Sequence, residues 1–361
     1  MSNIARRWRA IMLSSLACVA LAATCADAGQ LEIGIDRSNL INEDEGVRQS
    51  TLEGIQGLHA TWFRDAANAS TANPKGRANL VDTIQRAKAL HLKVLLNIIQ
   101  LDADYDDNNA GAPRTRCGWS ERKLSTISQP KLSARLETLL GALKSARLEI
   151  DAFEIGNEND TSCYNGDIPD GRYASEQELR IAVLGYAHFL QTVAETVKRP
   201  EFYPQAKLIT FGIAHGDDRY DNPPHHVPHP ARMIQMLRDL DGVDYLDNPR
   251  YRIDGIGTHI YAAPNDIAQS IEEKLQQDAA ILGRGKPFWI TEWGFLNKKA
   301  FPNRKGQSLD VAVRECLATF ERLQDTLRLG PVMFYSYNNW VVEDGRPTQA
   351  AEAFRGYAGA P

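Results

Sequence analysis

The sequence IDAFEIGNE, residues 150–158, is an apolar run that ends in a polar pair, Asn157 and Glu158. The stretch PFWITE, residues 287–292, has the same form and ends in Glu292. Short apolar runs of this kind predict β-strands that are buried on both faces, as in a parallel sheet. Each glutamate therefore stands where a buried strand ends. A carboxylate in that place is costly to desolvate unless it has a partner or a chemical task.

Further apolar runs of the same kind recur along the chain, with amphipathic segments between them. The predicted strands are Leu31–Asp36, Ala60–Asp65, Leu92–Ile99, Ile150–Glu158, Ala206–Ala214, Ile253–Tyr261, Pro287–Glu292 and Gly330–Tyr337. Between strands, helical spacing places five leucines on one face: Leu132, Leu136, Leu139, Leu140 and Leu143. Ser175 and Glu178 form a capping-box pattern that opens another predicted helix. Alternating strands and helices predict an α/β fold, a single (β/α)8 TIM barrel spanning residues 29–361.

A doubly wound open sheet is the rival architecture. It calls for a glycine-rich phosphate-binding turn after an early strand, and the sequence has none. No Pro-, Ser- or Gly-rich linker divides the chain of 361 residues into two domains. The barrel is therefore the favoured prediction.

The first 28 residues have the pattern of a secretory signal peptide. Three arginines, Arg6, Arg7 and Arg9, precede the apolar segment Ala10–Ala23, and small residues flank Asp27. This apolar segment is too short to span a membrane comfortably. We expect residues 1–28 to be removed and the protein to be exported to the periplasm or the extracellular space.

Export would allow the cysteines to form disulfides, because an oxidising compartment favours these bonds. Residues 29–361 contain Cys117, Cys163 and Cys316. The first two lie in polar loop sequence and the third in an apolar helical pattern. We predict a Cys117–Cys163 disulfide and a free, buried Cys316. The net charge of −5 gives no electrostatic basis for nucleic-acid binding. We expect no later membrane span, and we expect a monomer.

Polar residues gather at the predicted carboxyl ends of the strands. They are Arg64, Asp65, Asn97, Asn157, Glu158, His259, Tyr261, Glu292, Trp293 and a cluster from Tyr335 to Trp340. In a TIM barrel, active sites lie at this face. Long loops follow the third, fourth and fifth predicted strands, at residues 100–129, 159–174 and 215–229, and we expect them to border the same face.

On these residues the chain resembles the retaining glycoside hydrolases of clan A, which include families 5 and 39. In that clan an Asn-Glu pair ends strand 4 and supplies the general acid/base, which implies this role for Glu158. A second glutamate ends strand 7 and is the nucleophile, which implies this role for Glu292. The resemblance also implies substrate-binding roles for Arg64, Asn157, His259, Tyr261 and Trp340. Family 5 enzymes often have a histidine at the end of strand 3, where this chain has Asn97, a further candidate for substrate binding.

The residues support the same chemistry directly. Retaining hydrolysis needs a nucleophile and a proton donor about 5–5.5 Å apart. Glu292 would attack the anomeric carbon and Glu158 would protonate the leaving oxygen. Asn157 would donate to the sugar 2-hydroxyl, and the Trp340 ring would face the apolar surface of the sugar. Tyr105, Trp119 and Tyr164 are candidates to extend that aromatic platform.

The expected function is thus an exported β-glycosidase that acts on a polysaccharide or oligosaccharide without a cofactor. Three alternatives remain open: a transglycosylase that uses the same glutamates, a non-catalytic carbohydrate-binding barrel, and a metal-dependent barrel hydrolase. Histidines and aspartates are frequent in residues 215–229, but their spacing is not that of a zinc site. We expect no metal.

Overall fold

The computed structural model describes residues 31–106, 117, 122–215, 227, 229–343 and 345–358. An eight-stranded parallel sheet forms the centre, in the order β5-β4-β3-β2-β1-β8-β7-β6. Its strands are β1 (Ile33–Asp36), β2 (Trp62–Ala67), β3 (Lys93–Ile98), β4 (Ala152–Ile155), β5 (Lys207–Thr210), β6 (Ile256–Tyr261), β7 (Phe288–Gly294) and β8 (Leu329–Tyr335). Isolated parallel bridges at Ile209–Gly255 and Ile213–Thr258 join β5 and the residues after it to β6 and the residue before it, which closes the sheet into a barrel. The predicted (β/α)8 fold is confirmed.

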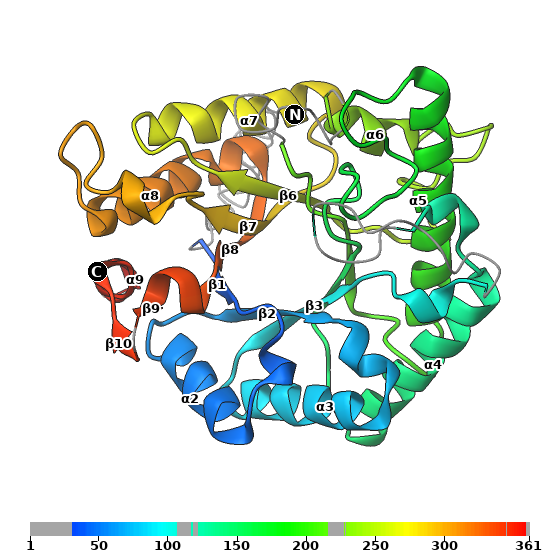
Figure 1. Ribbon diagram of the computed structural model, residues 1–361, viewed down its shortest axis with the longest axis horizontal. Helices are drawn as coiled ribbons and strands as arrows, with labels where there is room; N and C mark the ends of the chain where they lie inside the picture. Colours follow the sequence, from blue (N-terminus) through cyan, green and yellow to red (C-terminus); the bar gives the residue numbers. More distant parts are fainter. Residues whose placement is uncertain are drawn as a thin grey trace, which may run out of the picture. The chain divides into compact units, whose positions relative to one another are not determined.

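Helices follow the strands and surround the barrel (Figure 1). They are α2 (Glu45–Gln56), α3 (Pro74–Ala89), α4 (Gln129–Ser145), α5 (Glu176–Val197), α6 (Ala231–Met236), α7 (Ile267–Leu282), α8 (Leu309–Leu327) and α9 (Gln349–Ala358). The five leucines predicted to share a face of α4 are all buried. Ser175 and Glu178 form the predicted capping box, which satisfies backbone N–H groups at the start of α5.

One end of the barrel interior is filled by an apolar layer. Its side chains are Trp62, Leu95, Ala152, Ile209, Trp289 and Met333, all buried. Trp62 and Trp289 meet edge to face, with ring centroids 5.3 Å apart. Such layers make a TIM-barrel core a packed plug rather than a pore. The polar residues Arg64, Asn97 and Glu154 follow two positions after Trp62, Leu95 and Ala152 on the same strands.

The fourth strand ends earlier than predicted, at Ile155 instead of Glu158. Gly156 has φ +90°, a conformation that favours glycine, and a Cβ there would lie 1.8 Å from the side-chain oxygen of Asn159. The chain turns at this glycine, so Glu158 belongs to the loop. The fifth strand is also shorter than predicted, and the seventh extends to Gly294.

The cysteines pair as predicted. Cys117 and Cys163 form a disulfide, and Cys316 is free and buried in α8. Among the described residues, no helix is long and apolar enough to cross a membrane. Trp119 and most of residues 215–229 lie outside the described residues, so the predictions for them remain predictions.

Candidate active site

Arg64 lies at the centre of the polar end of the barrel. Its side chain projects from β2 and is 2% exposed. The guanidinium donates to Glu292 Oε1 at 2.7 Å, to Glu154 Oε2 at 2.8 Å and to Asn157 Oδ1 at 2.9 Å, and it also contacts Asp36. A planar guanidinium has five donors in fixed directions, so one side chain can hold several acceptors in place. Arg64 thereby links four strand ends.

Glu292 lies on β7 and is 6% exposed. Its Oε1 accepts from Arg64, and its Oε2 accepts from the Tyr261 hydroxyl at 2.6 Å. Burial, and then the charge of Glu292, raises the pKa of Tyr261 well above its usual range, so the phenol remains a donor. Both oxygens of Glu292 therefore receive hydrogen bonds suited to an ionised carboxylate.

Glu158 faces Glu292 from the loop after β4. It has a φ of 44°, and its side chain is 23% exposed. Its Oε1 lies 2.8 Å from His259 Nδ1, and the same nitrogen is 3.6 Å from Glu292 Oε2. Oxygens of the two glutamates lie within 4.8 Å of each other. The two carboxylates thus form a close pair bridged by one imidazole.

His259 is fully buried on β6, next to Glu292 in the register between β6 and β7. Burial lowers the pKa of His259, but the charges of Glu292 and Glu158 more than offset this and raise it to about 9. Its ring packs against Gly212, where a Cβ would lie 2.0 Å from Nε2. A glycine at position 212 is therefore what makes room for the imidazole.

We expect Gly212→Ala to lower activity by roughly 100-fold, because its methyl group would push the His259 ring away from Glu158. Overpacking of the buried site would also cost about 1–3 kcal/mol of stability. Gly141→Ala on α4 is the control, since a Cβ there meets nothing within 4 Å. Cleavage of a glycoside, the activity expected from the sequence, and urea unfolding would be measured for both variants. Equal behaviour of the two would show that His259 tolerates displacement.

A cavity of about 310 Å³ lies above these residues. Its lining comprises Ser38, Asn39, Ala66, Asn68, Asn97, Ile99, Asn157, Glu158, Tyr164, Tyr261, Glu292 and Tyr335. The structure thus brings five of the eight site candidates to the cavity wall. Arg64 and His259 lie behind that wall and contact its carboxylates. Of the candidate loop aromatics, Tyr164 lines the cavity, whereas Tyr105 is buried elsewhere.

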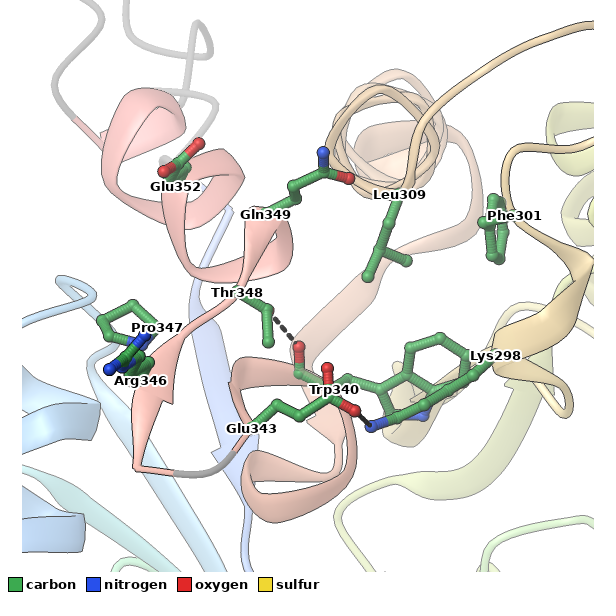
Figure 2. A pocket seen from close by; sticks show the side chains of 10 residues that line it. All are labelled: Lys298, Phe301, Leu309, Trp340, Glu343, Arg346, Pro347, Thr348, Gln349 and Glu352. Carbon is green, nitrogen blue, oxygen red and sulfur yellow. Dashed lines mark hydrogen bonds and ion pairs between the residues drawn. The ribbon is translucent and has the colours of Figure 1, made fainter.

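Trp340, the predicted aromatic contact for the sugar, is not among the residues that line this cavity. Trp340 is 6% exposed and packs edge to face against Phe295 and Phe301, at centroid distances of 5.9 and 6.5 Å. It lines a separate cavity of about 880 Å³ with Lys298 and Glu343, as Figure 2 shows. Trp340 belongs to a π-helix, Tyr337–Val341, that follows β8.

Tyr335 is the last residue of β8. It lines the cavity, and its ring meets that of Tyr261 edge to face, with centroids 6.2 Å apart. Burial, and then the charge of Glu292, raises the pKa of Tyr335 to about 12. The sequence predicts Tyr335 at the end of the eighth strand, but it predicts the sugar contact at Trp340.

Other site residues were not identified from the sequence. Ser38, Asn39 and Asn68 follow β1 and β2 and line the cavity, while Asp36 and Glu154 contact Arg64 from below. The sequence contains a sign of Ser38, Asn39 and Asn68 as site residues, because they lie shortly after the ends of the first two predicted strands. Glu154 lies inside an apolar run, and no residue close to it in the sequence indicates that it pairs with Arg64.

Asp160, near Glu158, is a buried carboxyl with a strongly raised pKa. One oxygen accepts from the Ala214 amide at 3.0 Å, and the other has no hydrogen-bond partner among the described residues. Burial, and then the charge of Glu158, raises the pKa of Asp160 from 3.8 to about 8. The native state therefore keeps a proton here that the unfolded chain releases near pH 4.

This proton makes stability depend on pH. Between about pH 4 and pH 8 the native state binds more protons than the unfolded state, so the free energy of unfolding falls as pH rises. We expect Asp160→Asn to leave stability unchanged near pH 4 and to raise it by several kcal/mol near pH 8. Urea unfolding at pH 4.5, 6 and 8 would test this, with exposed Asp170→Asn as the control. Parallel pH curves for wild type and Asp160→Asn would contradict the expectation.

Glu158, His259 and Glu292 are also the described residues whose geometry comes nearest to a metal site, with one candidate ligand atom each within 4.8 Å of the others. Their atoms are already engaged, because His259 contacts both carboxylates and Glu292 accepts from Arg64 and Tyr261. A metal ion would have to displace these contacts. We therefore do not assign the three residues as metal ligands.

Comparison with known proteins gives matches only at the level of structure. No protein-family model and no curated protein matches the sequence. An endo-1,4-beta-D-mannanase from Thermotoga petrophila RKU-1 matches with a TM-score of 0.54 and 14% identity, over 91% of this chain and 99% of the other. A GH5-4 broad specificity endoglucanase from an uncultured bacterium matches with a TM-score of 0.59 and 15% identity, over 92% and 95%. A Bacteroides ovatus GH5 xyloglucanase matches with a TM-score of 0.56 and 15% identity, over 92% and 75%. At these identities the likeness establishes a shared barrel fold.

Proposed function

We propose that this protein is a retaining glycoside hydrolase of clan A, with Glu292 as nucleophile and Glu158 as general acid/base. The observation that carries the proposal is the spacing of the two glutamates, whose oxygens lie within 4.8 Å of each other across the cavity. Retaining enzymes hold their two carboxyl groups about 5–5.5 Å apart, whereas inverting enzymes need about 6.5–9.5 Å to admit a water molecule. The short spacing supports retention.

In the first step Glu292 attacks the anomeric carbon, and the bond to the leaving oxygen breaks as Glu158 protonates that oxygen. Arg64 and Tyr261 hold the Glu292 carboxylate in place by one hydrogen bond to each oxygen. Glu158 has the exposure that proton transfer to a substrate requires, and it lines the same cavity as Glu292.

In the second step Glu158, now ionised, removes a proton from water, and the hydroxide oxygen displaces Glu292 from the anomeric carbon. Asn157 has its Oδ1 occupied by Arg64 and Asn97, so its amide N–H groups remain for a substrate hydroxyl. We assign the aromatic contact with the sugar to Tyr335 in place of Trp340. Asn97 is assigned to the same sugar-binding wall.

The substrate is proposed to be a β-linked polysaccharide or oligosaccharide. Three of the structural neighbours are described as an endo-1,4-beta-D-mannanase, a broad specificity endoglucanase and a xyloglucanase. The polar groups of the cavity lining are amides, hydroxyls and carboxylates, which suit the hydroxyl groups of a sugar. No cofactor enters the proposed reaction.

The test is hydrolysis of a panel of aryl β-glycosides and β-linked oligosaccharides, followed by proton NMR in the first minutes. We expect the β-anomer to form first. Initial formation of the α-anomer would exclude retention, and loss of activity with a chelator would favour a metal-dependent hydrolase. Lengthened products would indicate a transglycosylase. Sugar binding without turnover would indicate a binding barrel.

The proposal includes export, with residues 1–28 as a signal peptide. The Cys117–Cys163 disulfide supports it, because such bonds persist mainly in oxidising compartments. Mass spectrometry of the protein secreted by an expressing bacterium would test the cleavage point near Gly29. A product that retains residues 1–28 in the cytoplasm would contradict it.

A further inference from the structure

Glu154 is a fully buried carboxyl on β4 that does not reach the cavity. Its Oε2 accepts from Arg64 Nε at 2.8 Å. Its Oε1 has no hydrogen bond of standard geometry among the described residues. Burial raises the pKa of Glu154, and the positive charges of Arg64 and His259, which favour the ionised form, offset this only in part. The nearby Thr291 side chain also lowers the pKa of the carboxyl. A buried carboxyl with one unused oxygen is costly unless a nearby group compensates it.

The unused oxygen faces His259. The distance from Glu154 Oε1 to His259 Nε2 is 3.9 Å, and this nitrogen likewise has no hydrogen-bond partner among the described residues. On the other side of the ring, Nδ1 lies 2.8 Å from Glu158 Oε1 and 3.6 Å from Glu292 Oε2. Each nitrogen of the imidazole is therefore directed at a carboxylate.

A neutral imidazole carries one N–H, and its other nitrogen is an acceptor. An acceptor facing a carboxylate oxygen is repulsive, so carboxylates on both sides require an N–H at both nitrogens. We propose that Glu154 is a positioning residue that holds His259 as the imidazolium, so that Nδ1 always donates to Glu158. This inference rests on the proposed function of Glu158 as the acid/base.

The consequence for catalysis concerns which oxygen of Glu158 carries the proton. When Nδ1–H donates to Oε1, the catalytic proton of Glu158 is directed to Oε2. In the first step Oε2 gives that proton to the leaving oxygen, and His259 keeps both of its N–H groups. A neutral His259 protonated only at Nε2 would instead accept the proton of Glu158 and compete with the substrate for it.

The charges around His259 are consistent with this assignment. Glu154, Glu158 and Glu292 surround the ring, and Asp160 is also close enough to interact with it, while Arg64 is the opposing cation. The pKa of His259, about 9, agrees with an imidazolium at neutral pH. The positive charge of Arg64 destabilises the protonated ring and lowers the pKa of His259, so the negative carboxylates are needed to offset this effect.

Glu154→Gln tests the proposal with little change of shape. Arg64 Nε donates to one side-chain oxygen, so the glutamine must place its carbonyl there and turn its NH2 group towards His259 Nε2. If the ring is protonated, the glutamine NH2 group and the Nε2–H group of His259 are then two donors that face each other. NMR titration of ¹⁵N-labelled histidine, with His259 assigned by its loss in His259→Gln, measures the result. We expect proton binding by His259 to weaken by about tenfold or more in Glu154→Gln.

The control is Glu273→Gln on the exposed side of α7, which leaves the surroundings of His259 intact. An unchanged His259 titration in Glu154→Gln would overturn the proposal. This measurement needs no substrate, so it decides the charge of His259 even if the protein is not a glycosidase.

A kinetic experiment tests whether the charge of His259 affects catalysis. With an aryl glycoside that the wild type cleaves, we expect the pH profile of kcat/KM to move to higher pH in Glu154→Gln. Removing a positive charge beside Glu158 and Glu292 favours their protonated forms. If the His259 titration moves but the pH profile stays in place with a uniformly lower rate, Glu154 has only a structural role and the positioning proposal fails.

Discussion

Replacement of Glu292 by alanine is expected to lower kcat by roughly 10⁴- to 10⁶-fold, because the covalent intermediate can no longer form. Arg64 and Tyr261, which hold this carboxylate, remain in the variant and keep the vacated space polar. Azide fits such a space and should attack the anomeric carbon from the same side. The expected product is the α-glycosyl azide, detected by NMR or mass spectrometry.

The matched variant is Glu158→Ala, which tests the other half of the assignment. With an aryl glycoside whose leaving group needs no protonation, the first step should proceed and the glycosyl-enzyme should accumulate. Azide should then yield the β-glycosyl azide, because it attacks from the side of the missing acid/base. If azide gave the same anomer with both variants, or if either variant kept full activity, the two roles assigned here would be wrong.

Replacement of Arg64 by methionine is expected to lower the stability of the protein by about 3–5 kcal/mol, the cost of leaving buried ionic partners without their counter-charge. Arg64 is the cation that contacts Asp36, Glu154 and Glu292. Activity should fall by at least about 10³-fold as well, since Glu292 loses the donor that orients it.

Urea unfolding at pH 7 and at pH 4.5 separates charge from packing in this variant. The loss of stability should be smaller at the lower pH, where the carboxyls take up protons in place of the guanidinium charge. Arg64→Lys is the control, because it keeps the positive charge but cannot form the fork of hydrogen bonds. Equal losses at both pH values would show that Arg64 contributes by packing and not by charge.

Local patterns were enough to predict the barrel. The apolar runs identify all eight strands, because parallel strands inside a shell of helices are buried on both faces and keep few polar residues. The same reasoning led to Glu158 and Glu292, since a polar residue at the end of such a run stands out. His259 and Tyr261 at the end of β6 were found in the same way, and the structure places all four together.

Other features depend on contacts between distant residues, and local patterns do not report these. The end of β4 at Ile155 follows from the turn at Gly156, where the Asn159 side chain leaves no room for a Cβ. Trp340 belongs to the π-helix after β8 and does not line the cavity, whereas Tyr335 on the strand does.

The sequence by itself determined the architecture, the pair of glutamates and the cysteine pairing, because each depends on residue type at a position that the strand order fixes. Only the tertiary structure decided which charged side chains of the site lie next to one another. Glu154 is a charged residue in an apolar strand. Its position is explained only by its proximity to Arg64, 90 residues away in the sequence, and to His259. Electrostatic energy depends on distance in space, and the folded barrel sets those distances.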